Sequence, residues 1–367
     1  MDSNRKWEIC AAAVRFNNTL DEALQDCRGL FPYESVKIFR NIYPRKTEAL
    51  IEEAWFSSDR HVSAEGYDSF VLSTWKFVPE SVRKIMNMLP EVCAKSLFLG
   101  APTMLQADQN RFDYRSSLLI DVVEPDRNPQ NVSVLNYDIG NLSGNEFRQQ
   151  FDMCFLDPPW YLDPLKYWLS VASQSVKDRG IVAFPLLQEL TRPSGSKDRD
   201  DVLRFAYHLG LEPVVHKDVI LYQPPSFERA ILRRIGLPPI CWKRADLIVC
   251  RRKFRKNVSC SLEPTVMPPF KRIKIGRVVF DVVFDRYDKN AKDIIRWKDQ
   301  EYWMLTPSRR DRYNVGCNVF TSNGARFFSS KPLELSRKLT EYAGVDVDKL
   351  GDILPEDLLA ECGESSC

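Results

Sequence analysis

The stretch 151–160, FDMCFLDPPW, holds the residues of this chain best suited to chemistry. Its apolar run 153–156 is typical of a buried strand, which two successive prolines cannot continue. Asp157 is therefore expected at the carboxyl end of a strand, where open α/β sheets bind their ligands. The Asp157 carboxylate and the Pro158 carbonyl can each accept a hydrogen bond from an amine, and the Trp160 ring can stack on a flat group. The stretch predicts a site for a planar, amine-bearing substrate, and a strand with a stiff turn is the alternative.

Two further acids, Asp121 and Asp138, follow other strand-like runs. Because the carboxyl ends of neighbouring parallel strands lie on one rim of the sheet, we expect both acids on the same rim as Asp157, where such sheets bind their ligands. Gly100 precedes Asp121 by close to the roughly 20 residues that separate a glycine turn from a ribose-binding acid. A nucleoside-like cofactor needs a turn without a side chain, an acid for the ribose hydroxyls and a polar group for the adenine amine. Gly100, Asp121 and Asp138 can fill these places.

The elements that must position these residues alternate between strands and helices, which predicts a parallel sheet covered on both faces. Strands are predicted at 96–99, 117–121, 132–135, 151–156, 180–185, 214–222 and 245–250. Helical patterns are predicted at 103–112, 162–176 and 200–210. The last two strands are expected to be neighbours around the long insert 223–244. The polar stretch 194–201 is interpreted as a surface loop, with a lid over the site as the alternative.

Four regions are predicted: a helical N-terminal region 1–92, a Rossmann-like α/β domain 93–256, a basic linker 257–273 and a β-rich α+β domain 274–367 with a helix and an acidic tail. Helices in the first region are expected at 19–31, 35–43, 47–58 and 79–90, with Thr19 and Thr47 as caps. In the last region, Ser322-Asn323-Gly324 is a hairpin signal and 332–344 is helical.

The segment 96–250 resembles the class I S-adenosylmethionine-dependent methyltransferases that act on amino groups, whose signature is Asp, Asn or Ser before Pro-Pro and an aromatic residue. The matching residues are Asp157, Pro158, Pro159 and Trp160 for the catalytic motif, Gly100, Ala101 and Pro102 for the cofactor turn, Asp121 for the ribose acid and Asp138 for the adenine-proximal acid. The resemblance implies a Rossmann-like fold, S-adenosylmethionine as cofactor and an amino nitrogen as methyl acceptor.

The form of the motif with Trp160 is similar to that of adenine-N6 methyltransferases acting on RNA. The turn at Gly100 more closely resembles that of small methyltransferases with an Asp-Pro-Pro-Phe or Asp-Pro-Pro-Tyr motif, some of which methylate lysine in proteins. The expected activity is therefore methylation of adenine N6 in RNA or DNA, with protein-lysine methylation as the alternative. Only Gly100 stands where the family has two or three glycines, and Pro102 follows it. An inactive methyltransferase fold that serves as a binding or assembly module is the other alternative.

Basic residues with interleaved aromatic rings favour nucleic acid as a partner, because bases stack on rings and phosphates pair with cations. The basic residues are Arg229, Arg233, Arg234, Lys243, Arg244, 251–256, Lys271, Arg272 and Lys274, and the rings are Phe227, Trp242, Phe254 and Phe270. Substrate contacts are predicted for Trp160, Tyr161, Phe227 and Arg229. A solvated charged face is the alternative, and a protein substrate or partner fits as well.

Composition narrows the class of protein. With 367 residues and 44% hydrophobic content, the chain predicts two or three domains with hydrophobic cores, and a net charge of +2 means that any nucleic-acid surface is a local patch. No apolar run approaches the roughly 20 residues that span a bilayer, so no membrane partner is expected. The ten cysteines form no CxxC pair and the three histidines lie apart, so no metal site is predicted. The chain is expected to be reduced and cytoplasmic, or nuclear in a eukaryote.

Overall fold

The structure, a computed structural model, describes residues 3–58, 71, 75–90, 94–106, 117–122, 132–142, 146–253, 268–276, 278–285, 290, 294–296, 303–304, 316–343 and 354–363. The chain forms two compact units. The first contains Met1–Leu50, Lys76–Gln223 and Cys241–Met267, and the second contains Ile51–Trp75, Pro224–Ile240 and Pro268–Cys367. In the part of the chain that the structure describes, no helix has both the length and the apolar character that a bilayer crossing requires.

The N-terminal region is helical, as predicted. Its helices are α1 Ser3–Phe16, α2 Leu20–Asp26, α3 Pro32–Ile42, α4 Pro44–Ser58 and α5 Pro79–Met88. Thr19 caps α2 as expected, because its side chain accepts a hydrogen bond from the Glu22 amide at 3.3 Å. The predicted cap at Thr47 is wrong. Helix α4 begins earlier, at Pro44, whose fixed φ suits a first helical turn, and the buried Thr47 hydroxyl donates to the Tyr43 carbonyl at 2.8 Å.

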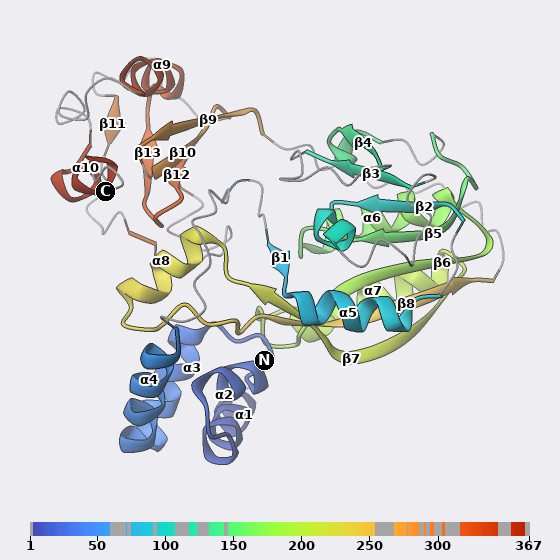
Figure 1. Ribbon diagram of the computed structural model, residues 1–367, viewed down its shortest axis with the longest axis horizontal. Coiled ribbons are helices and arrows are strands. Elements are labelled where there is room, and N and C mark those ends of the chain that lie inside the picture. The colour runs from blue at the N-terminus through green and yellow to red at the C-terminus, as the bar shows by residue number, and fades with distance from the viewer. Residues whose placement is uncertain are drawn as a thin grey trace. The chain divides into compact units, whose positions relative to one another are not determined.

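The first unit is built around an eight-stranded sheet in the order β1-β7-β8-β6-β5-β2-β3-β4 (Figure 1). Its strands are β1 Lys76–Phe77, β2 Ser96–Leu99, β3 Leu118–Asp121, β4 Ser133–Asn136, β5 Phe151–Leu156, β6 Val176–Leu187, β7 Leu211–Gln223 and β8 Arg244–Arg252. Strands β4, β3, β2, β5 and β6 are parallel, as predicted, and β7 and β8 are neighbours, as predicted. The α/β fold class is thus confirmed.

The expectation of a wholly parallel sheet is wrong at one edge. Strand β8 runs antiparallel to both β6 and β7, and the short β1, which was not predicted, pairs antiparallel with β7. The reason is the connection 224–243, which returns the chain from the carboxyl end of β7 directly into the next strand position. Such a return reverses the strand direction, whereas a parallel strand needs a crossover over the sheet.

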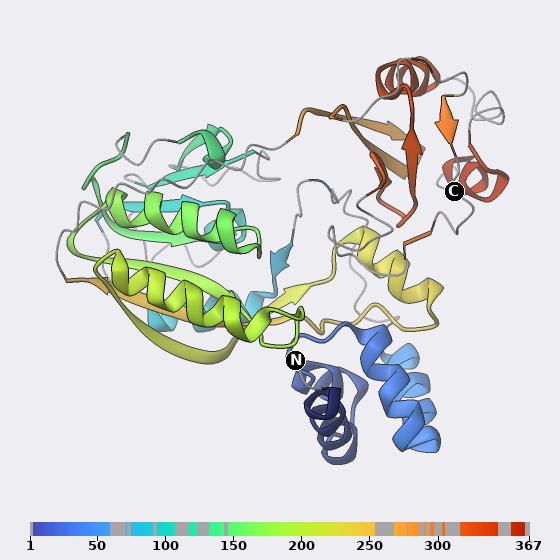
Figure 2. The ribbon, with the colours of Figure 1, turned by 180° about the vertical axis from the view of Figure 1, so that it is seen from behind.

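Helices cover both faces of this sheet. Helices α6 Leu162–Ser175 and α7 Gly195–His208 lie on one face (Figure 2), and α5 lies on the other (Figure 1). The α6–α7 face encloses a core that includes Leu156, Leu169 and Val182. The predicted loop 194–201 is wrong, because α7 begins at Gly195: Asp198 in its first turn accepts hydrogen bonds from the residues that precede the helix. The predicted helix 103–112 is a 3-10 helix at Pro102–Gln106, and its remainder lies outside the described residues.

The second unit contains a five-stranded antiparallel sheet in the order β11-β13-β12-β10-β9. Its elements are α8 Ser226–Arg234, β9 Phe270–Ile275, β10 Val278–Val283, β11 Ile295–Arg296, β12 Val319–Thr321, β13 Arg326–Ser329, α9 Pro332–Tyr342 and α10 Glu356–Gly363. The predicted hairpin at 322–324 is confirmed, with Gly324 at φ +83°. Residues 270–273 of the predicted linker are part of β9, and 254–267 lie outside the described residues.

Candidate active site

The loop after β5 has the form that the sequence predicts. The Asp157 amide donates to the Leu99 carbonyl at 3.0 Å, which ties the first residue of the loop to the neighbouring strand β2. Pro158 is buried, and the Pro159 carbonyl accepts a hydrogen bond from the Tyr161 amide at 2.8 Å. Helix α6 begins directly afterwards. The motif is therefore a short, stiff connection at the carboxyl end of β5, where α/β sheets place their ligand-binding groups.

The carboxyl group of Asp157 has a specific hydrogen-bond donor. The Tyr222 hydroxyl, near the end of β7, donates to its Oδ1 at 2.9 Å, and Tyr222 is 1% exposed. Burial and the Asp157 charge raise the pKa of Tyr222 well above its ordinary value, so the phenol remains a donor at neutral pH. Tyr222 thus holds one oxygen of the carboxylate, and a substrate amine can donate to the other.

The protonation of Asp157 is set by opposing effects. Burial raises the pKa of Asp157 to about 7. The Tyr222 hydrogen bond and the Lys243 ammonium lower this pKa, and the charge of Asp121 raises it. A carboxyl group that titrates near neutral pH can take a proton from an amine and release it again to water.

The half-buried Trp160 ring lies among three polar neighbours. The Tyr222 ring meets it edge to face, with centroids 5.2 Å apart and an interplanar angle of 81°. The Lys243 Nζ lies 4.1 Å from the Trp160 centroid and 5.3 Å from the Tyr222 centroid. The Trp160 carbonyl accepts a hydrogen bond from Arg192. Trp160 is therefore fixed at its backbone, along its edge and over its face.

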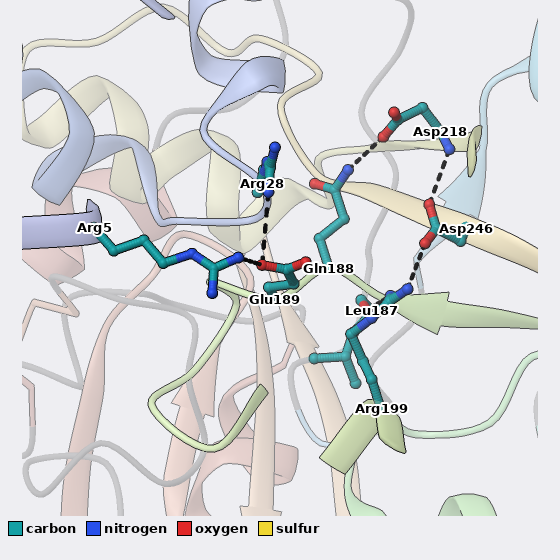
Figure 3. A network of polar contacts seen from close by, with 8 residues as sticks. All are labelled: Arg5, Arg28, Leu187, Gln188, Glu189, Arg199, Asp218 and Asp246. Carbon is teal, nitrogen blue, oxygen red and sulfur yellow. Dashed lines mark hydrogen bonds and ion pairs between the residues drawn. The ribbon is translucent and has the colours of Figure 1, made fainter. Parts of the chain in front are cut away.

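The loop between β6 and α7 reaches this motif through Arg192. Besides its bond to the Trp160 carbonyl, Arg192 donates from Nε to the Asp198 carboxylate at 2.6 Å, and its guanidinium lies 5.9 Å from the Tyr161 ring centroid. On the other side of the same loop, Glu189 pairs with Arg5 at 2.8 Å and with Arg28 at 3.7 Å (Figure 3). The loop thus connects the N-terminal helices with the Asp157–Trp160 motif.

Gly100 lies beside the motif, as predicted, but packing explains why this residue is a glycine. Its φ is +60°, and an added Cβ would lie 2.6 Å from Cζ3 of Trp168 on α6 and 3.3 Å from the Asp157 carbonyl oxygen. Glycine is therefore required by the backbone conformation and by α6, whatever the cofactor. Ala101, which follows, is buried, and Pro102 opens the 3-10 helix.

The predicted ribose acid lies next to this turn. Asp121 is the last residue of β3, it is buried, and the Gly100 amide donates to the carbonyl of the preceding Ile120 at 2.8 Å. Its charge acts on the Asp157 pKa, so the two acids lie within electrostatic range. A turn of positive φ with a buried acid beside it, on the rim that carries Asp157, suits a nucleoside.

Asp138 lies after β4 and has a structural task of its own. Its Oδ1 accepts a hydrogen bond from the Gly140 amide at 2.8 Å, which caps the 3-10 helix Ile139–Asn141. The Tyr137 amide donates to the Asp121 carbonyl at 3.0 Å, which joins this segment to the end of β3.

Two predicted substrate residues belong to the second unit. Phe227 and Arg229 lie on α8, and Phe227 is 2% exposed with its ring 6.4 Å from that of Trp75. This is the burial of a core residue, which argues against stacking on a substrate base. Trp242 is also buried, edge to face with Phe31 at 5.6 Å. Phe254, the third ring of the proposed set, lies outside the described residues.

Sequence reasoning missed Tyr222 and Arg192, and it counted Lys243 only as part of a basic patch. Tyr222 offered a weak signal, because it stands at the end of a predicted strand directly before Gln-Pro-Pro. Arg192 and Lys243 offered none, since their positions depend on how distant strands pair.

No protein-family model matches this chain, and no curated protein sequence does. Solved structures do resemble it. The branched-chain polyamine synthase C9 mutein from Thermus thermophilus, in complex with N4-aminopropylspermidine and 5′-methylthioadenosine, has a TM-score of 0.52 at 13% identity over 72% of this chain and 91% of its own. A putative methyltransferase from Bacillus halodurans C-125 has a TM-score of 0.34 at 10% identity over 47% and 99% of the two chains. The likeness to the polyamine synthase shows the fold alone: this chain has a Rossmann-like α/β fold.

Proposed function

We propose that this protein transfers the methyl group of S-adenosylmethionine to an amino nitrogen. The observation that carries the proposal is the position of Asp157, held by Tyr222 at the carboxyl end of β5 beside the Gly100 turn and within electrostatic range of Asp121. One rim of the sheet then offers a nucleoside-binding side and an amine-binding side that meet at Asp157. Group transfer between two bound reactants requires this juxtaposition.

The residues of the rim have distinct tasks in this proposal. The 100–102 turn and Asp121 would hold the cofactor, with the Asp121 carboxylate accepting from the ribose hydroxyls and Asp138 near the adenine. When bound, the cofactor supplies an electrophilic methyl group on a sulfonium. Asp157 and the Pro158 carbonyl accept hydrogen bonds from the acceptor amine, which localises its lone pair and orients it. The Asp157 carboxylate then takes the proton that the amine releases.

The first acceptor that we propose is the N6 amino group of adenine in RNA or DNA. The Asp-Pro-Pro-Trp motif supports it, because Trp160 can stack on a base, and Lys243 adds positive charge near the motif. Because Phe227 and Trp242 are buried, these two rings no longer support the stacking of nucleic-acid bases that the sequence predicted. A lysine side chain of a protein is the alternative acceptor of the same chemistry.

A second candidate is alkyl transfer to an aliphatic amine. It is supported by the Lys243 ammonium against the Trp160 face, because a substrate alkylammonium could make the same contact with the ring. The structural likeness extends over 72% of this chain to a polyamine synthase that was solved with an aminopropylated polyamine and methylthioadenosine. The chemistry is the same attack by nitrogen on a carbon bound to sulfonium, with an aminopropyl group in place of methyl.

The test has two steps on the full-length protein. Calorimetry measures binding of S-adenosylmethionine, and transfer of label from the cofactor is then measured on RNA, DNA, protein and polyamine pools. Asp157→Ala is expected to abolish transfer and to leave cofactor binding intact. Asp152→Ala is the control, because Asp152 lies at the opposite end of β5, paired with Lys177 at 2.7 Å.

The outcomes separate the candidates. The mass added to the acceptor distinguishes a methyl from an aminopropyl group when each sulfonium donor is supplied. Cofactor binding without transfer to any pool would indicate a binding or assembly module with a methyltransferase fold. A protein that binds no adenosyl sulfonium at all contradicts the proposal.

A further inference from the structure

Lys243 is held at the rim by a rigid backbone. Its carbonyl accepts a hydrogen bond from the Tyr222 amide at 3.0 Å, so the two residues are fixed to each other where β7 and β8 meet. The preceding Trp242 is buried against Phe31, and the following Arg244 opens β8 and donates to Gln25. The Lys243 side chain therefore starts from a defined point beside the catalytic motif.

The end of this side chain lies over the Trp160 ring, the ring that the proposed function assigns to the acceptor group. Nζ is 4.1 Å from the Trp160 centroid and 5.3 Å from the Tyr222 centroid. The Tyr222 hydroxyl donates to Asp157, and the Lys243 charge acts on that same carboxyl group. Two aromatic faces with a carboxylate form the kind of surface that binds alkylammonium groups. Lys243 is an alkylamine that already occupies it.

We infer that Lys243 is itself a methyl acceptor, so that the protein methylates the Nζ of its own Lys243. The inference rests on the proposed function, because it uses the same cofactor and the same carboxylate. It goes beyond that function by assigning a modification site to the chain. It also implies that Lys243 competes with external amines for the face of Trp160.

Self-methylation transfers one methyl group to Nζ and releases one proton. The Lys243 ammonium first loses a proton, which passes through a water molecule to the Asp157 carboxylate. The Nζ lone pair then forms a bond to the methyl carbon of S-adenosylmethionine, while the carbon–sulfur bond breaks and its electron pair stays on sulfur. The products are a methylated, positively charged Lys243 and S-adenosylhomocysteine, and Asp157 returns its proton to water. Methylated lysine keeps its charge, so the contact with the Trp160 face persists.

The first experiment incubates the purified full-length protein with S-adenosylmethionine and maps the modification by peptide mass spectrometry. The expected result is the mass of one or more methyl groups on Lys243, absent from Asp157→Asn. Lys243→Arg keeps the charge on the ring and is expected to remove the modified peptide. Methylation that maps to other lysines, or persists at full rate in Asp157→Asn, overturns the inference.

A second measurement requires no turnover. An amine-acylating reagent labels the lysines in the presence and absence of S-adenosylhomocysteine. The rate at Lys243 is expected to fall several-fold when the product fills the adjoining site, because access to Nζ is then restricted. Lys177, which pairs with Asp152 at the other end of the sheet, serves as the control and should label at an unchanged rate. Equal labelling of Lys243 in both samples counts against the inference.

These outcomes distinguish the inference from the function on which it rests. An external amine that is methylated while Lys243 stays unmodified preserves the proposed function and overturns self-methylation. A chain that binds no adenosyl sulfonium and modifies neither acceptor overturns both. Modification of Lys243 in the absence of any other acceptor supports both.

Discussion

Asp157 gains its chemistry from residues far away in the chain. Its carboxyl group is drawn out of water at the end of β5, and the partners that favour the charged form are Tyr222 and Lys243, both near the β7–β8 junction. The balance leaves a pKa of about 7, so small changes in either partner move the group across the physiological range. The state of this single carboxyl group therefore links activity with stability.

The first prediction concerns the pH dependence of transfer. Asp157 must be ionised to accept from the amine, so kcat/KM is expected to rise with pH through about 7. In Tyr222→Phe the hydrogen bond that lowers the Asp157 pKa is lost, so the midpoint of the rise should move to higher pH. Tyr207→Phe, on the exposed side of α7, is the control and should keep the wild-type midpoint. An unchanged profile in Tyr222→Phe would show that Asp157 is not the titrating group.

The second prediction concerns stability. Because the folded state raises the pKa of Asp157 above that of the unfolded chain, the folded protein binds this proton more tightly, and stability falls as pH rises from about 4 to about 7. Asp157→Asn removes the charge, and it is expected to increase the free energy of unfolding by about 1 to 3 kcal/mol above pH 7. The gain should vanish near pH 4. Urea unfolding at several pH values measures it, and a gain that does not depend on pH contradicts the assignment.

At the scale of elements, the loop between β6 and α7 positions the backbone of the Asp-Pro-Pro-Trp motif. Arg192 connects it to the Trp160 carbonyl, and Asp198 in the first turn of α7 fixes the Arg192 guanidinium. Side-chain exposures of 15% for Arg192 and 11% for Asp198 make this pair more than a screened surface contact. The direction of the Trp160 backbone therefore depends on where α7 begins.

The third prediction follows from this arrangement. Arg192→Ala removes the donor that orients Trp160, and kcat is expected to fall about 10- to 100-fold, because small misplacements of a positioned group have effects of that order. Binding of S-adenosylhomocysteine should stay the same, since the cofactor side is untouched. Arg192→Lys should fall between the two, because an ammonium cannot reproduce the planar fork. Arg204→Ala is the control, because Arg204 is an exposed arginine on α7 that pairs with Asp201. Equal losses of cofactor affinity and kcat would indicate a general structural role instead.

The helices of the first 50 residues and the sheet belong to the same compact unit. Arg5 and Arg28 pair with Glu189, and Arg199 bridges the carbonyl of Leu187 and the Asp246 carboxylate in the same network (Figure 3). The first 50 residues accordingly cluster with the sheet rather than with 51–75. The exposed ion pairs are each worth about 0.2 to 1 kcal/mol, so close packing must supply most of the attachment.

The fourth prediction tests this packing at Gly29. Its φ is +86°, and an added Cβ would lie 2.3 Å from the Thr191 Oγ1 and 3.3 Å from the Gln188 Cβ. Gly29→Ala is expected to lower the free energy of unfolding by about 2 to 4 kcal/mol, from backbone strain and overpacking together. Gly236→Ala has a similar φ of +78° but meets nothing within 4 Å, so only about 1 to 2 kcal/mol is expected.

Urea unfolding measures the free energy of unfolding of Gly29→Ala and of Gly236→Ala. Gly29→Ala combined with Thr191→Ala should recover part of the loss, because the atom that the new methyl group meets is then absent. If Gly29→Ala and Gly236→Ala lower the free energy of unfolding by equal amounts, the N-terminal helices pack less closely against the β6–α7 loop than the structure indicates.

The sequence by itself determined seven of the eight strands of the first sheet, all but β1, together with the Asp-Pro-Pro-Trp corner after β5 and the order of turn and acid along the rim. These features are local: an apolar run forms a strand, prolines end it, and a strand end presents the next residue at the rim. The resemblance to amino-methyltransferases added the expected fold, which the structure confirms. The start of α7 was missed because polar residues favour loops, and the helix start there is fixed by hydrogen bonds from Arg192 and Ser194 to Asp198.

The tertiary structure alone decided which side chains surround Asp157. Tyr222 is 65 residues away in sequence, and Lys243 reaches the site only because β8 inserts between β6 and β7 in antiparallel direction. The same long-range packing buried Phe227 and Trp242, which no pattern of spacing distinguishes from rings on a surface. Sequence spacing specifies which face of an element a residue occupies, whereas the partner across that face depends on strand order and on the entropy and packing of the whole chain.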